Sequence, residues 1–245
     1  MQMKTVIVLT MILIGSGIVN AQNDLSTNST NTTPSPDISG AFVFEYGSNH
    51  LLEASPEMKT EFWKSPTFNV YYSYPIKIRD SHFSFNPAIG IGNEKLGFTR
   101  SNTFIDSLSY TRVKPIGDLP YFDSEPEVRN TQIAAHYIDI PLEIRFNSNK
   151  ENHKGSLYLA IGGKVGFRYD SKTKIKYIEN EQNKVMKDSQ SYNLNTFRYG
   201  AHIKLGAGPF AFWGYYGLNK YFKSNKVEGV ENPTLFSFGM SLSTF

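Results

Sequence analysis

The sequence predicts an all-β chain that folds as an antiparallel up-and-down transmembrane β-barrel of about eight strands. Three observations carry this prediction: strict alternation of apolar and charged side chains in one strand, recurrence of that alternation along the chain, and connectors that alternate between long and short. A period of two places successive side chains on opposite faces of a sheet. An apolar face opposite a charged face is typical of a strand with lipid on one side and a lumen on the other.

The clearest strand covers residues 137–146. All of its even positions are apolar, and its three charged residues, Asp139, Glu143 and Arg145, fall on the odd positions. A helix would scatter these charges around its circumference. A strand in a soluble sandwich also alternates, but here the polar face carries both charge signs opposite a fully aliphatic one. The segment therefore indicates lipid outside and charge inside.

Further segments repeat this alternation and supply the other strands. They are residues 39–46, 66–78, 83–92, 157–168, 197–205, 210–218 and 236–242. The inner face of 83–92 holds only small residues and Asn86. Alternation continues at 172–177, which predicts a hairpin arm standing clear of the membrane.

The connectors give an independent test of the barrel. Their predicted order is long, short, long, medium, long, short, long, and the longest, 99–131, exceeds an ordinary connection inside a compact soluble domain. Outer-membrane barrels join an even number of strands by short periplasmic turns and longer external loops. The order therefore predicts a multi-pass protein of the outer membrane with both termini in the periplasm.

The N-terminal part is typical of an exported protein. Residues 1–21 combine Lys4, an apolar run and small residues before Gln22, which predicts a signal peptide. Residues 22–38 are rich in Asn, Ser, Thr and Pro and are expected to be a disordered leader. Residues 39–245 then form the outer-membrane β-barrel domain.

Composition and motifs exclude several functions. The chain has no cysteine, so disulfides and thiolate metal sites are excluded, and its formal charge of +3 does not argue for nucleic acid. Metalloprotease, serine-hydrolase and phosphate-loop motifs are absent, and the histidines outside the predicted lumen are too scattered for a metal site. We expect no cofactor and no catalytic residue, and hence no enzyme.

Several segments resemble the PorT-like outer-membrane β-barrel family of gram-negative bacteria. The segments that carry the resemblance are 137–146 with its Ile-Pro-Leu-Glu core, 162–167, 171–174 and 215–219. The resemblance implies a small barrel of the cell envelope, and the protein that gives the family its name is associated with secretion across the outer membrane. The terminal Phe245 resembles the aromatic residue that the barrel-assembly machinery reads, although it falls out of phase with the preceding strand.

The candidate site is a network of inward-facing polar side chains. Its predicted members are Glu45, Asp139, Glu143, Arg145, Lys164, Arg168, Arg198, His202 and Lys204. An eight-stranded barrel is just wide enough for side chains to fill it, so these charges are expected to form ion pairs that plug the lumen. We expect the cation beside Asp139 to be Arg145, Lys164 or Arg168. The alternative, His202 as a general base, requires access for a substrate.

Three functional hypotheses follow from the sequence. The first is a non-enzymatic barrel whose external loops contact a surface or secretion protein, a surface glycan or lipopolysaccharide, with outer-membrane lipid around it and the barrel-assembly machinery as a partner during biogenesis. The second is an outer-membrane enzyme, either a protease or a lipid-modifying enzyme. The third is a narrow pore for small solutes. The predicted plug favours the first.

Overall fold

The computed structural model describes residues 40–107, 110–120, 122, 126–149, 155–179 and 181–244. The predicted signal peptide (1–21), the predicted leader (22–38) and the terminal Phe245 lie outside the described residues. Within the described part of the chain, no helix is long and apolar enough to cross a membrane.

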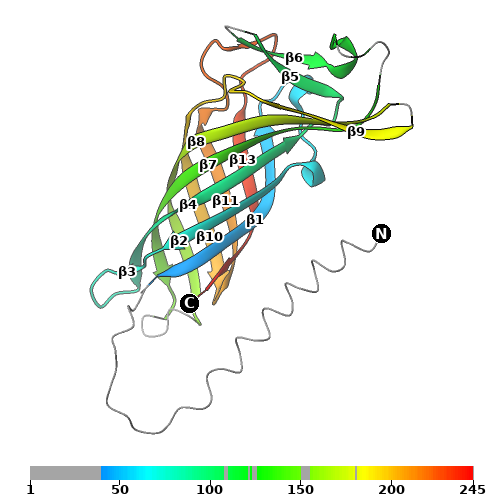
Figure 1. Cartoon of the computed structure of the whole chain (residues 1–245). Helices are drawn as coiled ribbons and strands as arrows, with labels where there is room; N and C mark the ends of the chain where they lie inside the picture. The colour runs from blue at the N-terminus through cyan, green and yellow to red at the C-terminus, as the bar shows by residue number, and fades with distance from the viewer. Residues whose placement is uncertain are drawn as a thin grey trace, which may run out of the picture. The chain divides into compact units, whose positions relative to one another are not determined.

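Eight strands form the wall of a closed antiparallel barrel, which confirms the predicted fold class (Figure 1). In order around the wall they are β1 (Ala41–Leu52), β2 (Pro66–Ser73), β4 (Phe83–Gly97), β7 (Glu127–Asn147), β8 (Leu157–Glu179), β10 (Phe197–Ala207), β11 (Phe210–Lys220) and β13 (Thr234–Ser243). The pairing of β1 with β13 closes the ring. Closure leaves no unpaired edge in the wall, which is what strands in lipid require.

The two faces of the wall follow the predicted alternation. Ile140 is 45% exposed on the outer face, whereas its neighbour Asp139 is completely buried. The same division holds on β10, where Ile203 faces outward and His202 and Lys204 face inward. The apolar outer face and the polar lumen are therefore properties of the whole wall.

Several strands differ in extent from the prediction. Segment 66–78 is divided, because β2 ends at Ser73 and the short β3 (Ile76–Lys77) pairs separately with β4. Pro75 lies at the break, and its missing N–H cannot continue a ladder. Strands β1, β4 and β7 extend beyond their predicted ends at one end of the barrel, where mixed polar and apolar residues hide the alternation.

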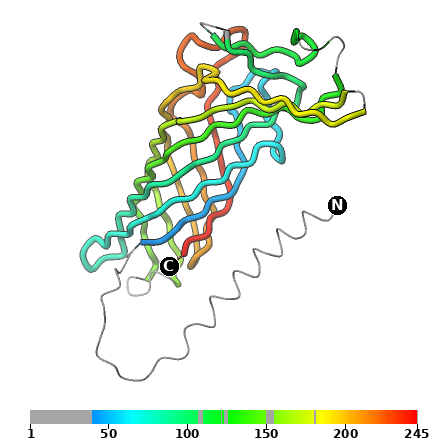
Figure 2. The backbone as a smooth tube through the Cα atoms, in the orientation of Figure 1, coloured from blue at the N-terminus to red at the C-terminus, as the bar shows by residue number. Residues whose placement is uncertain are grey.

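The connectors alternate as predicted. At one end, here called the turn end, lie the β10–β11 turn, the β2–β4 connection with β3, the beginning of β1 and the end of β13 (Figures 1 and 2). At the opposite loop end, β5 (Asn102–Ser107), β6 (Tyr110–Pro115) and β12 (Val227–Glu228) form a separate three-stranded sheet. Strand β9 (Gln182–Ser189) pairs with the outer part of β8 to form the predicted arm.

The loop end has an apolar core that includes Met58 of the short 3-10 helix η2 (Pro56–Met58). Ile116 of η4 (Ile116–Asp118) is buried in a second, smaller apolar cluster, whereas η3 (Phe62–Lys64) has no buried residue. Met58, Phe104 and Phe222 pack with Tyr137, Trp213 and other residues of the barrel wall. The loop-end connections are thus packed against residues of the barrel wall.

Candidate functional site in the barrel lumen

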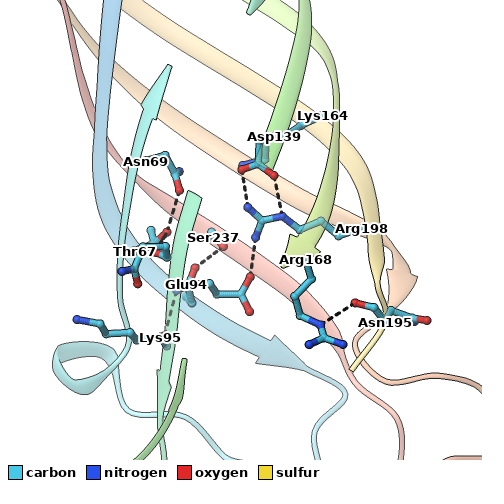
Figure 3. Close-up of polar contacts among 12 residues, drawn as sticks. Thr67, Asn69, Glu94, Lys95, Asp139, Lys164, Arg168, Asn195, Arg198 and Ser237 are labelled. Atoms are coloured by element: carbon cyan, nitrogen blue, oxygen red, sulfur yellow. Dashed lines mark hydrogen bonds and ion pairs between the residues drawn. The ribbon is translucent and has the colours of Figure 1, made fainter. Parts of the chain in front are cut away.

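Arg198 of β10 lies at the centre of the first group of ion pairs (Figure 3). Its Nη2 is 2.6 Å from Oδ2 of Asp139 and its Nε is 3.2 Å from Oδ1, while Nη1 is 2.6 Å from Oε2 of Glu94. The guanidinium carbon lies 3.8 Å from the centre of the Tyr137 ring, and the Tyr71 hydroxyl donates to Asp139 at 3.2 Å. One arginine therefore bridges two buried carboxylates with bidentate geometry on one of them.

The strand register explains why Asp139 meets Arg198. Asp139 of β7 and Arg198 of β10 both lie opposite Gly166 of the intervening β8. A Cβ added at Gly166 would overlap the Asp139 carboxylate and lie 3.0 Å from Cγ and Nε of Arg198. The missing side chain leaves room for the pair to meet across β8. Arg198, which makes these direct contacts, was not among the three cations that we expected beside Asp139. Of those three, Lys164 interacts electrostatically with Asp139.

Lys204 and His202 form the second group, nearer the turn end. Lys204 Nζ lies 3.1 Å from Oε1 of Glu45 and 3.0 Å from Oε1 of Glu143. His202 Nδ1 is 2.7 Å from the same Glu143 oxygen, and Asn69 donates to Glu45 at 3.0 Å. Each carboxylate thus has several polar partners, as buried charges require.

The strand register also explains why His202 meets Glu143. Glu143 and His202 lie opposite Gly162 of β8, one on each side. His202 is 1% exposed, with its ring centre 6.0 Å from that of Trp213. A general base needs a reacting group within hydrogen-bond reach, and the ring here is enclosed by protein. The geometry fits a structural histidine better than a catalytic one.

Lys164 lies between the two groups and contacts aromatic rings. It is 2% exposed, its Nζ is 4.3 Å from the centre of the Tyr215 ring, and it lies 3.5 Å from the Tyr71 hydroxyl. Besides His202, the buried acidic and basic residues of the described lumen are four carboxylates and four cations, whose formal charges balance; the half-buried Arg168 lies outside this set. The set consists of Glu45, Glu94, Asp139 and Glu143, with Arg145, Lys164, Arg198 and Lys204.

The two remaining predicted members lie at opposite ends of the network. Arg145 is near the turn end, where its Nε donates to Asn147 at 2.8 Å and its guanidinium carbon lies 3.5 Å from the centre of the Tyr158 ring. Arg168 is near the loop end and donates to Ser171 Oγ at 2.7 Å and to the backbone carbonyl of Leu194 at 3.2 Å. Arg168 is thus apart from the ion pairs.

Glu94 is the member that sequence reasoning missed. The predicted strand ends at 92, but β4 continues to Gly97 and Glu94 is 1% exposed. The alternation itself could have identified Glu94, because it continues the series of alternate, inward-facing positions that holds Gly90 and Gly92. The mixed sequence after 92 conceals that continuation.

The space left in the lumen is small. A cavity of about 30 Å³ borders Glu143, Arg145 and Lys204, and another of about 20 Å³ borders Arg198. The larger holds roughly one or two waters. Among the described residues, no group of three histidine, cysteine or acidic side chains could hold a metal ion. The ion pairs fix the charged side chains across the lumen, and a solute could pass only by breaking them.

Comparison with known proteins identifies a family. A family model described as "Outer membrane protein beta-barrel domain" matches residues 16–223, which include the whole lumen network. Ail, the attachment invasion locus protein of Yersinia pestis, solved with the heparin analogue sucrose octasulfate, aligns with a TM-score of 0.35 and 13% identity over 84% of this chain and 97% of Ail. The N-terminal β-barrel domain of Pseudomonas aeruginosa OprF aligns with a TM-score of 0.28 and 9% identity over 84% of this chain and 98% of that domain. A search of curated proteins found no match.

Proposed function

This chain belongs to the outer membrane protein beta-barrel domain family, and from that premise we propose that it is a closed, non-enzymatic barrel presenting a docking structure at the cell surface. In this proposal the loop end faces outward and the turn end, where β1 begins and β13 ends, faces the periplasm. The partner is a surface or secretion protein or a surface glycan. One observation carries the proposal: the lumen is filled, whereas the loop end is built out into an ordered structure with its own core.

The filled lumen argues against transport. Arg198 and Lys204 each bridge two carboxylates across the barrel, and breaking such a buried pair costs about 3–5 kcal/mol. A conducting path would have to disrupt both groups together. The enclosed His202 likewise argues against catalysis within the lumen.

The arm offers a specific means of docking. Strand β9 ends the order of the large sheet, so its outer edge carries backbone N–H and C=O groups with no neighbouring strand in the described chain. Such an edge can accept an extended segment of another protein as an additional strand. The resemblance to PorT-like proteins adds support for a place in secretion or surface assembly.

The test is a deletion strain complemented with an arm-trimmed protein. Thr173 and Asp188 face each other across the arm, so replacing residues 174–187 by Asn-Gly closes the hairpin at that point. The control carries Asn-Gly in place of Arg79-Asp80 in the turn-end connection. We expect the deletion to remove a defined protein or glycan from the cell surface, and the parent and the control to restore it.

The trimmed protein, at equal abundance in the outer membrane, should not restore that component. Full restoration by the trimmed protein, or an unchanged surface in the deletion strain, would contradict docking through the arm. Hydrolysis or lipid transfer by the purified protein would contradict the non-enzymatic assignment.

A further inference from the structure

Five lysines gather on one face of the arm and the adjoining wall. Lys172, Lys174 and Lys176 alternate along β8, and Lys187 of β9 lies directly opposite Lys174. Lys95 of β4 joins them, because it and Lys172 both lie opposite Ala134 of β7. Directly opposed residues of antiparallel strands share a face. We call these residues the lysine face.

The lysine face is the continuation of the outer wall of the barrel. The other face of the arm is covered at the loop end, where Ile175 packs with Ile116 and Leu119 and Thr173 hydrogen bonds to Tyr192. The lysines therefore point to the side on which, farther along β8, the apolar wall residues face lipid. Tyr169, 55% exposed, precedes them on the outer wall, and aromatic residues border the membrane in outer-membrane barrels.

The arm leans out past the wall of the barrel (Figures 1 and 2). A sheet that leans away from the barrel axis turns its outer face toward the surrounding membrane surface. With the loop end facing outward, as proposed above, the lysine face is turned toward the headgroups of the neighbouring lipids.

The positive charges of this face are poorly compensated within the described chain. The ion pair recorded there joins Lys172 to Asp170 at 3.7 Å. Desolvation and the neighbouring ammonium groups, Lys176 first and then Lys187, lower the pKa of Lys174 below its ordinary value. A bound anion would relieve this repulsion, and a phosphate can accept hydrogen bonds from several ammonium groups.

We propose that the lysine face binds the phosphate groups of the anionic glycolipid headgroups around the barrel and so holds the arm on the membrane surface. The inference rests on the proposed function only for the outward orientation of the loop end. It assigns the membrane-facing side of the arm to lipopolysaccharide phosphates and leaves the edge of β9 to the partner. Each lysine near an anionic surface changes affinity by about fivefold, so three together contribute about a hundredfold.

The experiment measures binding to the full-length barrel folded in neutral detergent. The probes are lipopolysaccharide, the same glycolipid with its phosphates removed, inorganic phosphate and an anionic polysaccharide. The test variant is Lys172→Gln/Lys174→Gln/Lys176→Gln. The matched control is Lys114→Gln/Lys223→Gln/Lys226→Gln, which removes the same charge from the loop end outside the lysine face. Folding of both is checked by the gel mobility of unboiled samples.

We expect the test variant to bind lipopolysaccharide about a hundredfold more weakly than the parent, the control to remain within about twofold, and phosphate removal to abolish the difference. Equal binding by the test variant, or undiminished binding of the dephosphorylated glycolipid, would overturn the proposal. Tighter binding of inorganic phosphate or of the polysaccharide would overturn the assignment to a headgroup. If these measurements fail while trimming the arm still removes the surface component, the proposed function stands and this inference alone is wrong.

Discussion

Replacing Arg198 by Met should strongly destabilise the barrel, because it leaves Asp139 and Glu94 buried without their shared cation. Both carboxylates are at most 1% exposed, and Arg198 contacts each of them at 2.6 Å. Removing one partner of a buried pair costs about 3–5 kcal/mol. With a urea dependence of about 2 kcal/mol per molar, this loss lowers the unfolding midpoint by roughly 2 M. The measurement is reversible unfolding in lipid vesicles, followed by gel mobility.

Two further variants separate charge from packing. Adding Asp139→Asn and Glu94→Gln to Arg198→Met removes the stranded charges, so the triple variant should recover to within about 1–2 kcal/mol of the parent. Arg168→Met is the matched control, because Arg168 donates to Ser171 and to backbone carbonyls and lies apart from the ion pairs; we expect a loss of roughly 1–2 kcal/mol. A loss below about 1 kcal/mol for Arg198→Met, or a triple variant no more stable than the single one, would refute the reasoning.

Three other results are expected. Ile140→Arg places a charge on the lipid face and should lower the free energy of unfolding by about 2–4 kcal/mol. Asp139→Asn should still fold, because Arg198 retains its ion pair with Glu94. A more stable Ile140→Arg than Asp139→Asn in the same vesicle assay would mean that the lipid and lumen faces are misassigned. Gly166→Ala should lower the free energy of unfolding by about 1–3 kcal/mol, because its methyl group would overlap the Asp139 carboxylate. Gly163→Ala is the control: its Cβ would lie 3.6 Å from the nearest atom, so its stability in urea should be nearly unchanged. The purified barrel should give little or no conductance in planar bilayers, and large stable channels would show that the lumen is open.

The alternation along each strand was sufficient to predict the barrel and the direction of its side chains. Lipid and lumen lie on opposite faces of one wall, so a period of two is expressed within any short segment, as in Ile138 to Arg145 of β7. The approximate positions of the connectors followed from the breaks in alternation, although alternation also continues into the arm at 172–177. Function left no comparable local pattern, because the loop end is assembled from connectors that lie far apart in the sequence.

The partners inside the lumen depended on the tertiary structure. Asp139 and Arg198 are distant in sequence and meet because β8 places Gly166 between them, a consequence of the register of three strands. Nothing in either segment alone encodes that register. Glu94 was missed because β4 continues into a region of mixed polarity that becomes a strand through its pairing with β2 and β7. The sequence determined which side chains face inward, and the register of the closed barrel decided which of them meet.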